Sequence, residues 1–127
     1  MRILNFEELN LEKQSMIEAI IGGAIFIHPT DTIYGIGCNA QDVKAVKKVR
    51  RLKARASNPF SVIAPSIDWI NENCIITKEA EERLNKLPGP YTLIFKLKKQ
   101  SVAKDVNPGL NTLGIRIPNH WISKLVN

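Results

Sequence analysis

The segment HPTDTIYGIGC, residues 28–38, follows a short apolar run at residues 24–27 and places hydroxyl and carboxylate groups directly after it. The apolar run predicts a short buried strand, which should end at Pro29 because proline lacks a backbone donor. In α/β proteins, ligands commonly bind where strands end, so the two threonines and the aspartate are candidates for holding a polar ligand. The same residues can instead form an Asx or ST turn that satisfies only its own backbone, and the residues alone leave both interpretations open.

Capping residues and hydrophobic periodicity predict the other elements. Asp42 suits a helix N-cap, and Val43, Val46 and Val49 continue from it as an apolar stripe. Residues 91–98 alternate between apolar and polar, which is typical of a strand. The expected elements are helices over residues 10–21 (capped by Asn10) and 42–53, shorter helices after Ser66 and Thr77, strands over 24–27, 61–64, 91–98 and 113–117, and a helical start after Pro118. Interleaved helices and strands predict an α/β (α+β) fold whose sheet is covered by helices on at least one face.

Composition favours a soluble, single-domain protein. The chain has 127 residues, of which 44% are hydrophobic and 24% charged, and no apolar run is long enough to cross a membrane. The N-terminal residues carry early acids and no long apolar stretch, so we expect no secretory signal and a cytoplasmic location. Cys38 and Cys74 lack metal-ligand spacing, so both are expected to be buried reduced thiols, with no metal site.

The net charge of +6 and a pI near 9.5 favour anionic partners. Much of this charge lies in residues 44–55, which contain lysines and arginines but no acid. Most of these cations should face away from the apolar stripe, either as a solvated surface or as a surface for a polyanion. The candidates for RNA binding are Lys47, Lys48, Arg50 and Arg51.

Three further cations lie where they could bind a ligand. Lys53 and Arg55 leave the expected helix beside Asn58, where a lysine and an arginine together can clamp phosphate oxygens. Arg116 lies inside an apolar strand, so its side chain either faces solvent or lines a pocket. His28 and His120 are interpreted as structural or surface residues.

Four segments, taken together and in order, resemble the YrdC-like family of threonylcarbamoyl-AMP synthases. They are HPTDTIYGIGCNA (residues 28–40), LKARASNPF (52–60), LPGPYTLIFKL (87–97) and TLGIRIPNH (112–120), and the similarity runs from about residue 11 to the C-terminus. The resemblance implies a twisted mixed parallel and antiparallel sheet, flanked by helices around a basic cleft.

The resemblance also implies an activity and its residues. Enzymes of this family join L-threonine, bicarbonate and ATP into threonylcarbamoyl-adenylate, which serves tRNA threonylcarbamoyladenosine modification, and Mg²⁺ is expected with the nucleotide. No catalytic side chain is implied, because the chemistry depends on positioning. Carried over by motif, Thr32 and Arg116 would bind threonine, while Lys53, Arg55, Asn58 and Thr112 would bind the nucleotide.

The chain also departs from the family pattern. Ala56 and Ser57 fill a shortened loop after the K-x-R motif, Ile63 stands where relatives often have histidine, and no S-x-N follows Arg116. We therefore expect residues 1–127 to be a single YrdC-like domain that lacks the C-terminal part of the usual domain. An exposed sheet edge would then favour a homodimer, or a partner from the threonylcarbamoyl-transfer machinery. The alternatives are a non-catalytic module that binds tRNA or double-stranded RNA, and a relic that binds a nucleotide without turnover.

Overall fold

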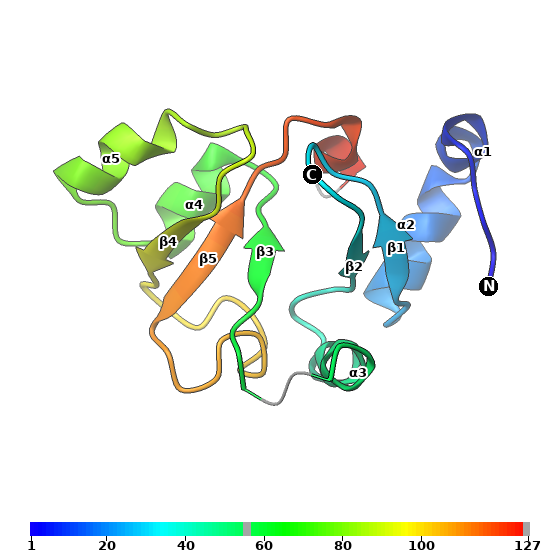
Figure 1. Ribbon diagram of the computed structural model, residues 1–127, viewed down its shortest axis with the longest axis horizontal. Helices are drawn as coiled ribbons and strands as arrows, with labels where there is room; N and C mark the ends of the chain where they lie inside the picture. Colours follow the sequence, from blue (N-terminus) through cyan, green and yellow to red (C-terminus); the bar gives the residue numbers. More distant parts are fainter. Residues whose placement is uncertain (55–56, 126–127) are drawn as a thin grey trace.

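The computed structural model describes residues 1–54 and 57–125 as a mixed α+β structure (Figure 1). Arg55, one of the predicted phosphate ligands, lies outside the described residues. The elements are α1 (Phe6–Leu11), α2 (Lys13–Ile21), β1 (Phe26–His28), β2 (Gly35–Gly37), α3 (Val43–Leu52), β3 (Ser61–Ile63), α4 (Ile67–Asn73), α5 (Lys78–Leu84), β4 (Leu93–Lys96), β5 (Thr112–Arg116) and the 3-10 helix η1 (Trp121–Leu125). Among the described helices, none has the length and apolar character needed to cross a bilayer.

A three-stranded sheet organises one half of the structure. β5 lies at its centre, parallel to β3 and antiparallel to β4, and this confirms the predicted mixed sheet. One face carries Leu113 and Ile115, which are 1% and 0% exposed, and packs into a core with Ile70 of α4 and Leu84 of α5. Figure 1 shows α4 and α5 on this side of the sheet, so one face is covered by helices as expected.

The opposite face of the sheet is more exposed and carries polar residues together with Ile94, which is 72% exposed. Thr112, Gly114 and Arg116 alternate with the buried residues of β5, so their side chains project from this second face. An added Cβ at Gly114 would lie 3.3 Å from the methyl of Thr92 and 3.4 Å from the Cβ of Ser61, which places β4 and β3 hydroxyl residues on the same face. The predicted threonine and nucleotide ligands on β5 therefore share one surface.

A second, two-stranded sheet lies beside the first (Figure 1), formed by the antiparallel pairing of β1 with β2. The expected buried strand at residues 24–27 is shifted to Phe26–His28, and Ile27 is 63% exposed, so the expectation of full burial was wrong. β2 was not predicted, because its two glycines suggest a loop. Gly37 is needed there, since a Cβ would lie 2.7 Å from the Phe26 ring.

The helix caps were predicted with mixed success. Asp42, Ser66 and Thr77 each accept a hydrogen bond from the first turn of the helix that follows, as expected. The helix expected to start at Asn10 instead forms two pieces that meet at Glu12, and Asn5 caps the first of them through a capping box with Glu8. The expected C-terminal helix is present as a 3-10 turn.

Helix α3 ends in an unfavourable backbone conformation that offers a stability test. Ala54 follows the C-cap Lys53 with φ of 52°, a left-handed conformation that glycine adopts without penalty. Ala54→Gly should raise the free energy of unfolding by about 0.5–1 kcal/mol in urea denaturation, since relief of strain exceeds the added entropy of the unfolded chain. Ala45→Gly, inside the same helix, should lower the free energy of unfolding by about 1 kcal/mol. If both glycine variants were less stable than the unaltered chain, the left-handed conformation at Ala54 would be contradicted.

Candidate functional site

The hydroxyl-rich loop between β1 and β2 meets the end of β5 through an ion pair. Asp31 Oδ1 lies 2.7 Å from the Arg116 Nη2, and Asp31 Oδ2 accepts the Asn119 backbone N–H at 3.0 Å. Both side chains are largely buried, with exposed fractions of 12% for Asp31 and 17% for Arg116. The first and fourth of the motif segments are thereby brought into direct contact.

The loop also satisfies its own backbone. The Thr30 hydroxyl donates to the Ile33 carbonyl at 2.7 Å and accepts the Thr32 N–H at 3.1 Å, which is an ST turn. Thr32 Oγ1 lies 3.4 Å from Arg116 Nη1, so the exposed hydroxyl of the turn stands next to the guanidinium. The turn interpretation of the loop is therefore confirmed, and the turn also places the Thr32 hydroxyl beside the arginine, where the ligand-binding interpretation stays a prediction.

The Arg116 guanidinium is not fully satisfied by its neighbours. Within the described part of the chain, its Nε is buried and has no hydrogen-bond partner. Buried donors in proteins are nearly always paired, so an unpaired one marks either strain or a place that another group fills. The guanidinium therefore has donor capacity beyond the one carboxylate that already contacts it.

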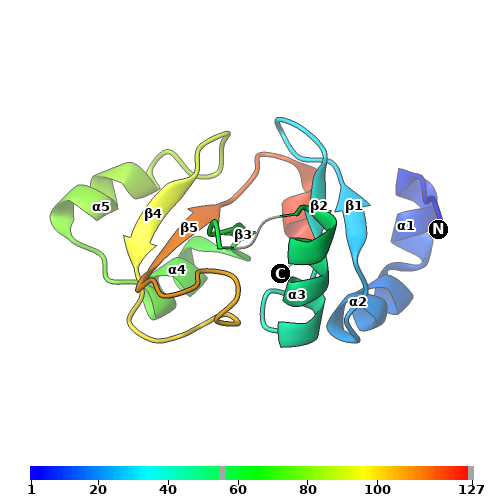
Figure 2. The ribbon, with the colours of Figure 1, turned by 60° about the horizontal axis from the view of Figure 1, so that its bottom comes forward.

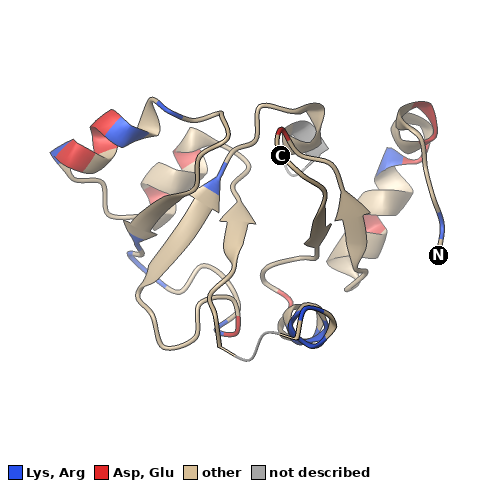
Figure 3. Cartoon of the chain, viewed as in Figure 1, with Lys and Arg blue, Asp and Glu red and all other residues tan. Residues whose placement is uncertain are grey.

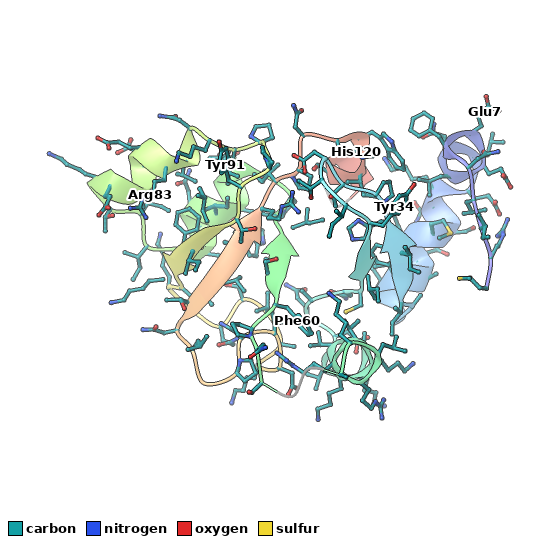
Figure 4. The ribbon with its side chains drawn as sticks, in the orientation of Figure 1. Glu7, Tyr34, Phe60, Arg83, Tyr91 and His120 are labelled. Atoms are coloured by element: carbon teal, nitrogen blue, oxygen red, sulfur yellow. The ribbon has the colours of Figure 1, made fainter. Side chains whose placement is uncertain are left out.

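The predicted nucleotide ligands lie toward the other end of the three-stranded sheet. Thr112 starts β5, four residues before Arg116, and at roughly 3.3 Å per residue the two are about 13 Å apart along the strand. Lys53, at the end of α3, has its ammonium 5.7 Å from the centre of the Phe60 ring, just before β3. In Figure 4, Phe60 lies beside α3, whereas Tyr34 and His120 lie at the opposite end, and Figure 2 brings α3 to the front of the view.

The predicted RNA-binding cations divide into two groups. Lys44, Lys47, Lys48 and Arg51 are exposed on one side of α3, and Figure 3 shows this helix as a concentration of positive charge. Arg50 does not belong to this surface, because it is only 8% exposed and donates to backbone carbonyls, including that of Asp105 at 2.6 Å. Its assignment as an RNA contact was wrong, since the side chain faces the interior.

The histidines have the structural character expected of them, whereas of the two cysteines expected to be buried only Cys74 is, and Cys38 is partly exposed. Cys38 and Cys74 are free thiols, and burial raises the pKa of both above the ordinary value. His28 is 8% exposed, with Nδ1 3.0 Å from the Pro29 carbonyl. His120 accepts the Ile122 N–H through Nδ1 at 3.2 Å.

Hollows among the described residues include one of about 420 Å³ between α4 and α5 and one of about 340 Å³ in the loop around Asn107. Neither is lined by a predicted threonine or nucleotide ligand. The candidate site is therefore the open face of the three-stranded sheet, bounded by the 30–33 loop at one end and by the exit of α3 at the other.

Sequence reasoning missed two features of this site. Asp31 was considered as a candidate for holding a polar ligand, but its pairing with Arg116 was not predicted. Asn119, whose N–H binds the same carboxylate, had no such signal, because its role depends on the backbone after β5.

The fold and the site together define a mixed α+β domain with a polar, arginine-containing site on an open sheet face. Residues 18–126 match the family model of the Sua5, YciO and YrdC domain, which carries the description "Telomere recombination", and the chain belongs to this family. This confirms the resemblance identified in the sequence.

Named relatives extend the comparison. The chain is 37% identical over 131 residues to the putative threonylcarbamoyl-AMP synthase of Methanocaldococcus jannaschii, a match covering 95% of this chain and 60% of that protein. The structure of Pyrococcus abyssi Sua5 complexed with L-threonine is similar with a TM-score of 0.82 at 29% identity, covering 99% of this chain and 36% of that one. Full-length HypF in its phosphate- and nucleotide-bound form is similar with a TM-score of 0.76 at 29% identity, covering 91% of this chain and 18% of that one. The chain thus spans less than two thirds of each of these relatives.

The Asp31–Arg116 pair can be tested by stability measurements. Asp31→Ala leaves a buried guanidinium without its carboxylate, so the free energy of unfolding should fall by about 3 kcal/mol in urea denaturation. Asp31→Asn keeps an oxygen that can accept a hydrogen bond from Arg116, so it should lower the free energy of unfolding by less than Asp31→Ala does. The matched control is Glu79→Ala, which breaks an exposed ion pair with Arg83 and should cost under about 1 kcal/mol. Equal losses for the two alanine variants would contradict the structural importance of the buried pair.

Proposed function

We propose that the chain forms threonylcarbamoyl-adenylate from L-threonine, bicarbonate and ATP. The observation that carries this proposal is the convergence of Arg116, Asp31 and Thr32, which come from two motifs far apart in the sequence and meet within hydrogen-bonding distance. Family membership supports the proposal, as does similarity to a Sua5 structure that holds L-threonine.

Threonine would bind at the end of β5. The Arg116 guanidinium would pair with the amino acid carboxylate, using donor capacity that Asp31 does not occupy, and the Thr32 hydroxyl beside it would add a hydrogen bond. Charge-assisted hydrogen bonds of this kind are among the stronger polar interactions in proteins. Asp31 would hold the guanidinium in place while the substrate binds.

ATP would extend along the open face toward the start of β5. Lys53, Asn58 and Thr112, together with Arg55, would contact the nucleotide. The similar HypF structure is in a phosphate- and nucleotide-bound form, which supports nucleotide binding in general. We propose that Mg²⁺ arrives with ATP, because this ion usually binds through substrate phosphates and keeps several waters. The described residues contain no group of three or more His, Cys, Asp or Glu side chains that could hold a metal ion.

The chemistry needs no protein nucleophile. The threonine amine forms a bond to the carbon of bicarbonate with loss of water, and the resulting carbamate oxygen attacks the α-phosphorus of ATP. The bond between the α-phosphorus and the bridging oxygen breaks, and pyrophosphate leaves with the negative charge. Fixed cations stabilise that charge, and holding the reactants together can supply effective molarities on the order of 10⁵ M or more.

The test is pyrophosphate release from ATP that depends on both threonine and bicarbonate. Arg116→Lys should reduce kcat/KM for threonine by about 10- to 100-fold, because a lysine cannot reproduce the paired donors of a guanidinium. Arg83→Lys is the control, since Arg83 is exposed on α5 at the far end of the sheet (Figure 4). Absence of threonine-dependent release from the unaltered chain at saturating substrates would overturn the proposal, whatever the variants do.

A second candidate function is RNA binding, favoured by one specific observation. Lys44, Lys47, Lys48 and Arg51 follow the i, i+3, i+4, i+7 pattern of a single helix face, and all are exposed. The α3 sequence contains no acid to neutralise them. A continuous cationic stripe of this kind suits the phosphate backbone of tRNA or double-stranded RNA.

Neutralising three of these cations tests the second function. Lys47→Gln, Lys48→Gln and Arg51→Gln combined should weaken tRNA binding and reduce the slope of log K against log salt by about 2–3, if each contacts one phosphate. The control replaces Lys78, Arg83 and Lys86 at α5 by glutamine, which makes the same change in net charge. Equal weakening by both triple variants would show that only overall charge matters and would reject α3 as the RNA surface.

The homodimer and the cytoplasmic location stay predictions. β3 is an edge strand of its sheet, which is the feature that the dimer prediction requires.

A further inference from the structure

Arg50 is a charged side chain within a hydrophobic interior. It lies on α3 among exposed lysines and arginines, yet its residue is only 8% exposed and faces inward with Val46 and Val49. A buried guanidinium is unfavourable unless its donors are paired, so the position of its partners reveals what the residue holds together.

Within the described part of the chain, Arg50 donates to backbone carbonyls of two separate loops. Its Nε donates to Asp105 O at 2.6 Å and its Nη2 to Val106 O at 3.3 Å, both in the loop before β5. Its Nη1 donates to Asn58 O at 2.9 Å, in the segment that leads from α3 into β3. The guanidinium thus joins the 105–106 loop to the backbone of a predicted nucleotide ligand.

Phe60 extends this arrangement toward a second predicted ligand. The Arg50 guanidinium lies 4.4 Å from the centre of the Phe60 ring, and the ammonium of Lys53 lies 5.7 Å from the same ring. The Phe60 N–H donates to Val106 O at 2.8 Å, the carbonyl that Arg50 also contacts. One aromatic ring is therefore held between a buried cation and a predicted phosphate-binding cation.

We propose that Arg50 is a positioning residue, which fixes Asn58 and, through Phe60, Lys53 in the geometry that binds the ATP phosphates. The inference rests on the proposed function, because it assumes that this end of the sheet face binds a nucleotide. Arg50 itself does not touch the substrate. A planar guanidinium can reach carbonyls in different directions while stacking on a ring, and an ammonium group cannot do both.

Arg50→Lys tests this role, with Arg83→Lys as the control, because Arg83 is an exposed arginine on α5, outside the candidate threonine, nucleotide and RNA sites. Arg50→Lys should raise the KM for ATP about tenfold and leave the KM for threonine within about twofold. Hydrogen exchange of the Phe60 amide should become faster, while amides in α4 and α5 keep their rates. Arg83→Lys should leave both KM values and the exchange rate of the Phe60 amide unchanged.

The outcomes separate this inference from the proposed function. If the unaltered chain binds ATP in calorimetry but releases no pyrophosphate, and Arg50→Lys weakens that binding, the inference stands and the synthase function fails. If the chain releases pyrophosphate and Arg50→Lys changes the KM values for ATP and threonine equally, or changes neither, the inference is overturned and the function stands. If the unaltered chain binds no ATP, both are overturned.

A second variant decides the case in which Arg50→Lys fails to fold. Phe60→Leu keeps an apolar side chain but removes the ring that both cations contact. It should therefore also raise the KM for ATP, by a smaller factor than Arg50→Lys does. An unchanged KM for ATP in Phe60→Leu would overturn the connection from Arg50 to Lys53.

Discussion

The buried ion pair between Asp31 and Arg116 joins the two halves of the protein. Asp31 belongs to the loop of the two-stranded sheet, and Arg116 ends the central strand of the three-stranded sheet. Because removing one partner of a buried pair leaves an unpaired charge in the interior, the loop and the strand are constrained to stay together. The Thr32 hydroxyl reaches the guanidinium only under that constraint, so the candidate threonine site depends on this interaction.

Arg50 provides a comparable constraint at the opposite end of the sheet face. Arg50 and Arg116 are both largely buried, but Arg116 pairs with a carboxylate, whereas Arg50 donates to backbone carbonyls. The lysines and arginines of the chain therefore have two separate roles. Some of its cations hold loops in place, and others, on the outer side of α3, face solvent and are free to meet an anionic partner.

Much of the fold was predictable from the sequence because its signals are local. The caps at Asp42, Ser66 and Thr77 and the alternation around β4 depend on neighbouring residues and were correct. The strand β2 was missed because its glycines serve the close approach of Phe26, which the sequence does not reveal. The inward orientation of Arg50 was missed because it depends on Asp105 and Val106, which lie 55 and 56 residues away in the sequence. Motif order predicted which residues form the candidate site, but not that its two ends are separated along β5.

The position of β5 in the sheet has a consequence for how the protein is made. β5 is the central strand, yet it follows β3 and β4 in the chain, and Ser61 pairs with Gly114. While the chain grows on the ribosome, β3 and β4 have no neighbour between them until the segment around residues 112–116 emerges. Their apolar faces stay available to chaperones, or to other nascent chains, throughout that interval. Asp31 precedes both strands, so its carboxylate is without its guanidinium for longer still, and the candidate threonine site forms only after β5 is made.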